Sequence, residues 1–323
     1  MAEKKNQHVV PQCYQRSWCA PDCPLEFEPY VWVFSKDGSA KKKKAPKNLF
    51  VENEKYTVRL TDGSRDLVVE DTLMRTEDAF VNVLSKIEDS RSLEMRDIAG
   101  LCIFTAAMHA RTNSMGRHFR NFLGELHELV VKGERAHNAL PVTSLETADM
   151  AQHAHQRMIQ ATLETLPQML YRMSLAILET DDELGFITSD TPAVWFDPDS
   201  HRRPPALRSP NLSDPRIQIS MPLTPRHTLL FSHSRFRGYM RATPQNVDAL
   251  NWRVRVRCSE HFISWKGQTK PSWFEKGVLP ADAWENTTEG THAVQEAQRR
   301  REAMEAWKRE HEERESNSNS SSL

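Results

Sequence analysis

GFITSDTPAVWFD, at residues 185–197, is the stretch that decides the fold class. It holds two short runs of apolar β-formers, and the polar SDTP between them predicts a turn. The stretch follows the acidic turn at 180–183 and opens with Gly185, which indicates that extended structure begins here after a helical region.

The chain beyond residue 197 continues the extended pattern. The segments IQISMPL (217–223) and HTLLFSH (227–233) are typical of strands. Thr243-Pro244 is a helix-start signal, with apolar residues at helical spacing behind it, and HFISWKG (261–267) predicts a closing strand. We therefore expect residues 181–267 to form a mixed sheet with one helix.

Helical periodicity dominates the chain before residue 180. Apolar residues from Leu73 to Ile87, and again from Ile98 to Thr105, recur at spacings of three and four. A further helical stretch is expected from about Ser144 to Glu179. These patterns predict a helical middle over residues 67–180.

Residues 1–66 predict a β-rich module. EPYVWVFSKDGSA (28–40) and FVENEKYTVRLTDG (50–63) each place β-formers before an Asp-Gly pair, which favours two hairpins. The lysine run at 41–44 is expected on a solvated strand edge.

The whole chain is thus predicted to be α+β. Residues 1–267 are expected to form one domain, and residues 268–323 a helical tail whose last ~40 residues turn into a charge-dense helix. The end SNSNSSSL (316–323) has no apolar residue before its final leucine, so we expect it to be disordered.

The composition bounds the location of the protein. No apolar run approaches the roughly 20 residues that a membrane helix needs, and the first residues lack the apolar core of a signal peptide. The five cysteines, an odd number without an export signal, favour free thiols. We expect a cytoplasmic protein with no membrane partner.

Charge is distributed unevenly along the chain, although the net charge is -1. Residues 141–200 hold ten acids and two bases, whereas residues 201–257 hold eleven arginines, no lysine and two acids. The two blocks either neutralise each other in the fold or leave an arginine surface that suits phosphate groups.

Four motifs carry a family resemblance. They are QHVVPQCYQR (7–16), Lys47-Asn48 with Tyr56, GFITSDTP (185–192) and MPLTP (221–225). In this order they resemble the landmarks of the domain-of-unknown-function 4238 family of bacterial and phage proteins, and Asn251 matches an asparagine in its C-terminal helix. The resemblance spans residues 6 to 267 and implies a family without implying a reaction.

The sequence departs from this family in its first motif. Gln7 stands where the family has the first of two histidines, Gln15 replaces a leucine and Trp18 a phenylalanine. If the paired histidines bind a metal together, this chain has lost one ligand. The family's occurrence implies a setting of bacterial or phage conflict.

His8 is the first catalytic candidate. With Pro11 it is similar to the edge of HNH nucleases, where a histidine activates water, and Asn48 could take the place of the middle residue. No histidine occurs between His8 and His109, however, so a compact metal unit cannot be completed locally. A zinc site from His8 and the cysteines at 13, 19 and 23 lacks a paired CxxC knuckle.

Asp190 is the second catalytic candidate, and His8 and Asp190 are the candidate ligands for a divalent metal. A carboxylate just after a predicted strand is a common position for a metal ligand or general base. The alternative is a turn in which Asp190 accepts hydrogen bonds from backbone N–H groups. We expect the His8 and Asp190 segments to lie together.

The remaining candidates are binding residues: Tyr14, Arg16, Tyr56, Arg111, Ser189, Asn251 and Arg253. Arg120 and His127 also resemble the arginine–histidine pair of HEPN ribonucleases, a spacing that arises often in charged helices. Walker, GxGxxG, GxSxG and HExxH motifs do not occur in the sequence.

These features predict a protein directed at nucleic acid, which we interpret as a metal-dependent nuclease. The competing interpretation is a non-enzymatic binding or regulatory protein. In it, His8, Tyr14, Arg16, Asn48 and Asp190 form a buried polar network that joins the N-terminal module to the C-terminal sheet.

Overall fold

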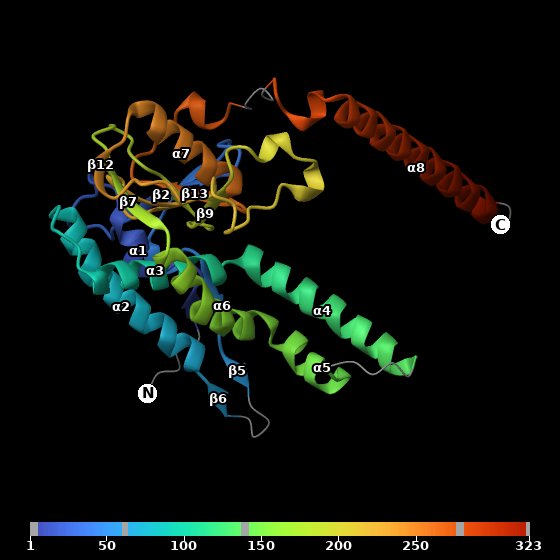
Figure 1. The fold of residues 1–323 in the computed structure, drawn as a ribbon, viewed down its shortest axis with the longest axis horizontal. Helices are drawn as coiled ribbons and strands as arrows, with labels where there is room; N and C mark the ends of the chain where they lie inside the picture. Colours follow the sequence, from blue (N-terminus) through green and yellow to red (C-terminus); the bar gives the residue numbers. More distant parts are fainter. Residues whose placement is uncertain (1–5, 60–63, 137–141, 276–280, 321–323) are drawn as a thin grey trace. The chain divides into compact units, whose positions relative to one another are not determined.

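The computed structural model describes residues 6–59, 64–136, 142–275 and 281–320 (Figure 1). The chain forms two compact units. The first joins Met1–Phe196 to Leu212–Glu275, so it extends beyond residue 267, and the second joins Asp197–Asn211 to Lys276–Leu323. The predicted α+β class and the order of its parts are confirmed.

The N-terminal module consists of short strands and single helical turns. Its elements are β1 (Asn6–His8), α1 (Gln12–Gln15), η1 (Arg16–Trp18), β2 (Val31–Ser35), β3 (Lys41–Lys44), η2 (Pro46–Asn48), β4 (Val51–Asn53), β5 (Val58–Arg59) and β6 (Arg65–Asp66). Strands β2 and β3 form the first predicted hairpin, and β3 is the edge of its sheet, as expected for the lysine run. Strands β5 and β6 are antiparallel, and the Asp-Gly pair at 62–63 lies outside the described residues.

The helical middle contains α2 (Val68–Glu88), α3 (Met95–Ala110), α4 (Asn113–Arg135), α5 (Ser144–Gln152) and α6 (Ala154–Tyr171). Local sequence sets several of their starts. Glu94 and Asp97 form a capping box at α3, Thr112 accepts from the backbone of Met115 at α4, and Thr143 begins a capping box at α5.

One part of the predicted helical middle was wrong. Ser174–Glu179 is strand β7, which pairs antiparallel with β11 (His227–Ser232) and parallel with β12 (Gly238–Arg241). A short apolar run can suit a buried strand as well as a helix. Here partners some 50 residues further along the chain decide the outcome.

The C-terminal sheet has the order β12-β7-β11-β10-β9 and is mixed, as predicted, because only β12 runs parallel to its neighbour. Its other strands are β9 (Val194–Phe196) and β10 (Gln218–Pro222). A second sheet, β3-β2-β13-β8, joins the N-terminal hairpin to β8 (Thr188–Ser189) and β13 (His261–Ser264). Helix α7 (Pro244–Arg257) begins at the Thr243-Pro244 signal, and η5 (Pro271–Trp273) follows β13.

The main core lies between the helical middle and the five-stranded sheet. Side chains from α3, α6 and the sheet meet in one buried cluster, in which Leu101, Leu170, Ile177 and Leu229 are almost wholly buried. Figure 1 shows α3 and α6 running beside each other under the sheet. Burial of this apolar surface is the main stabilising contribution to the first unit.

The second unit contains η3 (Ser200–Arg202), η4 (Pro205–Leu207), η6 (Trp284–Asn286) and α8 (Thr288–Ser320). Ion pairs join its two segments: Arg202 binds Asp282 at 2.6 Å, and Arg208 binds Glu285 at 2.6 Å. The tail is helical as expected, and α8 also includes residues 316–320, where we expected disorder. Residues 321–323 lie outside the described residues.

Candidate functional site

The family-like motifs meet around the backbone of residues 185–188. Asn251 accepts from the N–H of Ile187 at 3.0 Å and donates to the carbonyl of Gly185 at 2.8 Å. The Trp18 indole donates to the carbonyl of Phe186 at 2.9 Å, and the Tyr14 hydroxyl contacts the Thr188 hydroxyl at 2.7 Å. These contacts join the first motif to the GFITSD motif, so the side chains of Tyr14 and Asn251 stabilise the fold.

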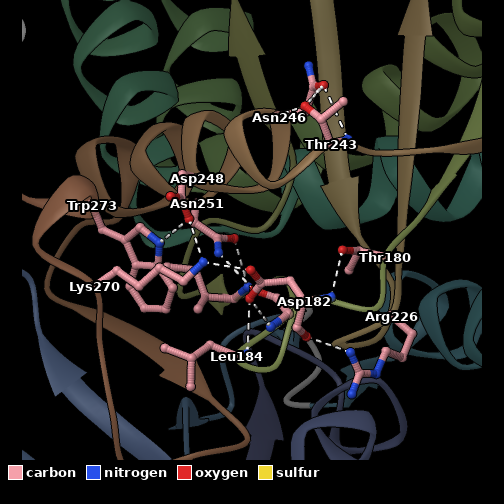
Figure 2. Close-up of polar contacts among 12 residues, drawn as sticks. Thr180, Asp182, Leu184, Arg226, Thr243, Asn246, Asp248, Asn251, Lys270 and Trp273 are labelled. Carbon is pink, nitrogen blue, oxygen red and sulfur yellow. Dashed lines mark hydrogen bonds and ion pairs between the residues drawn. The ribbon is translucent and has the colours of Figure 1, made fainter.

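The turn before Gly185 is held by a second polar network (Figure 2). The Asp182 carboxylate accepts from the backbone N–H of Leu184 at 3.0 Å and from Lys270 at 2.6 Å. Lys270 also binds Asp248 at 3.0 Å, and Arg226 donates to the Asp182 carbonyl at 2.5 Å. Both cations are therefore engaged in fixing the turn.

Asp190 binds the backbone of the segment that leads into β13. Its carboxylate accepts from the N–H groups of Ser259 at 2.7 Å, Glu260 at 2.7 Å and His261 at 3.0 Å. The side chain is partly buried, as both interpretations of this residue require. Three backbone donors on one carboxylate are the geometry of a turn-stabilising aspartate.

His8 lies in a different polar cluster. Arg111, which is 3% exposed, donates to the His8 carbonyl and pairs with Glu77 at 2.7 Å. The Tyr56 hydroxyl donates to the Arg111 carbonyl at 3.2 Å. Burial lowers the pKa of the His8 imidazole, and its Nε2 has no hydrogen-bond partner among the described residues.

The structure brings the His8 and Asp190 segments to one place without joining their side chains. Val9, the neighbour of His8, lines a small cavity of about 100 Å³ together with Asp190. The His8 side chain instead lines a cleft of about 760 Å³ with Tyr56, Glu77 and Arg111. A shared catalytic site of His8 and Asp190 stays a prediction.

The other candidate residues have varied surroundings. Arg16 and Asn48 are exposed, so they do not belong to a buried network. Ser189 is buried, and its hydroxyl accepts from the N–H of Thr191 at 3.0 Å. Arg253 stacks 3.8 Å above the Phe196 ring and donates to Gln218 at 2.7 Å.

The parts of the chain that the structure describes contain no set of side chains suited to bind a metal ion. No group of three or more histidine, cysteine, aspartate or glutamate side chains there could hold an ion. All five cysteines are free thiols, which confirms the prediction from their number.

The arginine block at 201–257 is largely engaged within the fold. Besides Arg226 and Arg253, the arginines with protein partners are Arg202, Arg203, Arg208, Arg216, Arg237, Arg241 and Arg255. Some partners, such as Asp181 and Asp197, lie in the acidic block, which favours the neutralisation alternative. The block therefore offers few free cations to a ligand.

A cationic cavity is lined by Glu52 and Lys55, whereas Tyr56 of the same segment lines the His8 cleft. The cationic cavity has a volume of about 440 Å³ and polar walls, and its lining residues are Glu52, Lys55, Asn113, Arg117, Arg120, Gln152, Ala154, His155 and Gln156. Three of these are cations and one is an anion. Arg117 and Arg120 are exposed at their positions on α4, and within the described ranges neither has an ion-pair partner.

The electrostatics of the cavity favour an anionic ligand. Burial lowers the pKa of the Lys55 ammonium, an effect that Glu52 opposes and Arg120 reinforces. Burial also lowers the pKa of His155 to about 4, so its imidazole is neutral near pH 7. A nearby anion would relieve the repulsion between Lys55 and Arg120.

The N-terminal end of α4 adds to this potential. The helix begins at Asn113, a lining residue of the cavity, and its first turn contains no acid. The unpaired N–H groups of a first turn carry partial positive charge, which favours an anion beside them. The smaller cavity beside Asp190 shares Glu52, Asn113 and Arg117 with this one, so the two adjoin.

Sequence reasoning missed most of this cavity. Lys55, Asn113 and His155 come from three separate segments, and only the fold brings them together. The available signal was the pair Arg117 and Arg120, whose spacing of three places both side chains on one helical face. Arg120 was noted only for a spacing to His127, which instead contacts Thr147 at 2.9 Å.

The first unit has an α+β fold, and side chains such as Asn251 and Trp18 bind backbone groups within it. A family model described as "Protein of unknown function (DUF4238)" matches residues 6–266. The chain belongs to this family, as the motifs predicted. No curated protein and no solved structure matches it. Among the described residues, no helix combines the length and the apolar character required to cross a membrane.

Proposed function

We propose that this protein binds nucleic acid through its phosphate groups, in the cavity lined by Lys55, Arg117 and Arg120. The observation that carries the proposal is the convergence of three cations and the α4 N-terminus on a cavity with a single carboxylate. Phosphate contacts from lysine, arginine and helix N-termini are the general source of affinity for nucleic acid.

The contacts of the motif residues favour a binding protein over a metal-dependent nuclease. Asp190 is engaged by three backbone donors, and Tyr14 and Asn251 bind the backbone and side chains of the fold. A binding role in the cytoplasm of bacteria or phage-infected cells, within a conflict between them, agrees with the setting that the family's occurrence implies.

The test is a titration of labelled single-stranded DNA and RNA, followed by fluorescence anisotropy at about 50 mM salt and again at about 200 mM. The Arg117→Gln/Arg120→Gln variant should bind at least about tenfold more weakly and show a smaller salt dependence, because two phosphate contacts are lost. Arg135→Gln, which removes an exposed arginine from the last turn of the same helix, is the matched control and should match the wild type.

Two outcomes would contradict the proposal. One is the absence of binding by the wild type at low salt. The other is equal binding by the double variant and the wild type. Cleavage of the same oligonucleotides with magnesium or manganese, and not with chelator, would favour the nuclease interpretation instead.

A further inference from the structure

Glu52, in β4, is the single carboxylate among the residues that line the cationic cavity. It accepts from Lys55 at 3.0 Å and from the side-chain amide of Asn113 at 2.5 Å. Its side chain is 41% exposed, whereas that of Lys55 is 8% exposed. Glu52 is therefore the more exposed partner of this ion pair, and it also lines the smaller cavity beside Asp190.

A phosphate that contacts Lys55 is repelled by the Glu52 carboxylate, which binds the same ammonium. Like charges at contact distance repel strongly in a partly buried site. The contacts of Glu52 within the cavity are made by its side chain alone, and its exposure leaves room for it to rotate into solvent. The Lys55 ammonium donates to Glu52 and to the side-chain oxygen of Asn113, so a ligand that binds it competes with the Glu52 carboxylate.

The charge of the ligand then decides whether the exchange is favourable. An internal phosphodiester carries one negative charge, so its replacement of the Glu52 carboxylate leaves the charge beside Lys55 unchanged. A terminal phosphomonoester carries about -1.5 to -2 at pH 7 and three acceptor oxygens. When it replaces the Glu52 carboxylate, the negative charge beside Lys55, Arg117 and Arg120 increases.

We infer that Glu52 is a built-in counter-ion that makes the cavity selective for the terminal phosphomonoester of a nucleic acid over its internal phosphodiesters. This inference rests on the proposed function of the same cavity. It assigns Glu52 the role of a specificity-determining residue, which disfavours singly charged groups by competing with them for Lys55.

The test compares oligonucleotides of one sequence with a 5′-phosphate, a 3′-phosphate or hydroxyls at both ends. The wild type should bind at least one phosphorylated form about tenfold or more tightly than the hydroxyl form, a difference that corresponds to 1.4 kcal/mol. In Glu52→Gln the hydroxyl form should gain affinity and the preference should shrink to a few-fold. Glu128→Gln, which removes an exposed acid from α4, is the control for net charge and should keep the wild-type preference.

The outcomes separate the two proposals. Equal binding of all three oligonucleotides by the wild type would overturn the selectivity while leaving nucleic-acid binding intact. An unchanged preference in Glu52→Gln would overturn the role of Glu52. No binding by either protein would overturn the proposed function, and the inference with it. If Glu52→Gln melts early, Glu52→Ala takes its place, since it also removes the carboxylate charge.

Discussion

Tyr14 and Thr188 lie 174 residues apart in the sequence, yet their hydroxyls are 2.7 Å apart in the core. The Tyr14 hydroxyl also donates to the carbonyl of Pro222 at 2.6 Å, and its burial raises the pKa of the phenol. One side chain thus connects three of the four family-like motifs.

Replacement of Tyr14 by Phe should lower the free energy of unfolding by about 2 kcal/mol, because the buried Pro222 carbonyl loses its donor and the buried Thr188 hydroxyl loses its partner. Urea denaturation measures the change. The variant Thr188→Val and the double variant complete a thermodynamic cycle, in which the double loss should be smaller than the sum of the single losses. Additive losses would show that the two hydroxyls do not interact.

Gly185→Ala should destabilise the protein by about 3 kcal/mol or more. Gly185 has a φ of +61°, and an added Cβ would lie 2.2 Å from the carbonyl oxygen of Pro225. Gly124 in α4 is the matched control, since a Cβ there meets nothing within 4 Å. Gly124→Ala should stabilise the helix by about 0.5–1 kcal/mol, and thermal melting of both variants checks the contrast.

Asp190→Asn should lower the free energy of unfolding by roughly 1–3 kcal/mol, because three backbone N–H groups lose a charged acceptor. Nucleic-acid affinity should stay within about twofold of the wild type. Asp78→Asn, on the exposed face of α2, controls for the loss of one charge. A variant with wild-type stability and abolished metal-dependent cleavage would instead make Asp190 catalytic.

Stability should fall as the pH drops from 6.5 toward 4, because His155 is buried in its neutral form. Its pKa is lowered from 6.5 to about 4, so the unfolded chain binds the proton more readily across this window. The full contribution, on the order of 3 kcal/mol, is present above pH 6.5. His109 has the same depressed pKa of about 4 and acts in the same direction.

His155→Gln checks this assignment by chemical denaturation at a series of pH values. The variant should lose less stability than the wild type between pH 6.5 and 4, since only His109 and other groups then contribute. Gln can keep a donor for the Ala110 carbonyl, which His155 contacts at 2.9 Å. Identical pH profiles would mean that His155 does not carry the effect.

Local signals were sufficient to predict much of the fold. The apolar spacing from Leu73 to Ile87 predicts the buried face of α2. The five residues of that pattern are all buried: Leu73, Phe80, Val83, Leu84 and Ile87. Thr243-Pro244 predicts the start of α7 to the residue. These elements are set by periodicity and capping, which act over a few residues.

Elements whose secondary structure depends on partners far away in the sequence could not be predicted from local signals. Strand β7 lies inside its sheet because β12 and β11 pair with it on either side, and nothing within Ser174–Glu179 reveals those partners. The cationic cavity is a similar case, since Lys55 and His155 meet only through the packing of α4 and α6 against the 52–57 segment. Asn48 and Arg16 were expected in a buried network because they belong to the family-like motifs, yet both are exposed.

The pairing of β2 with β13 has a consequence for how the chain folds as it is synthesised. β2 spans Val31–Ser35, and its neighbour β13 begins only at His261. At translation rates of about 5–20 residues per second, the N-terminal hairpin waits roughly ten seconds or more for that neighbour. During this interval β2 has one open side, while the lysines of β3 discourage pairing with other nascent chains at the opposite edge of the hairpin. The charge of that strand thus protects an unfinished protein as well as the edge of a finished sheet.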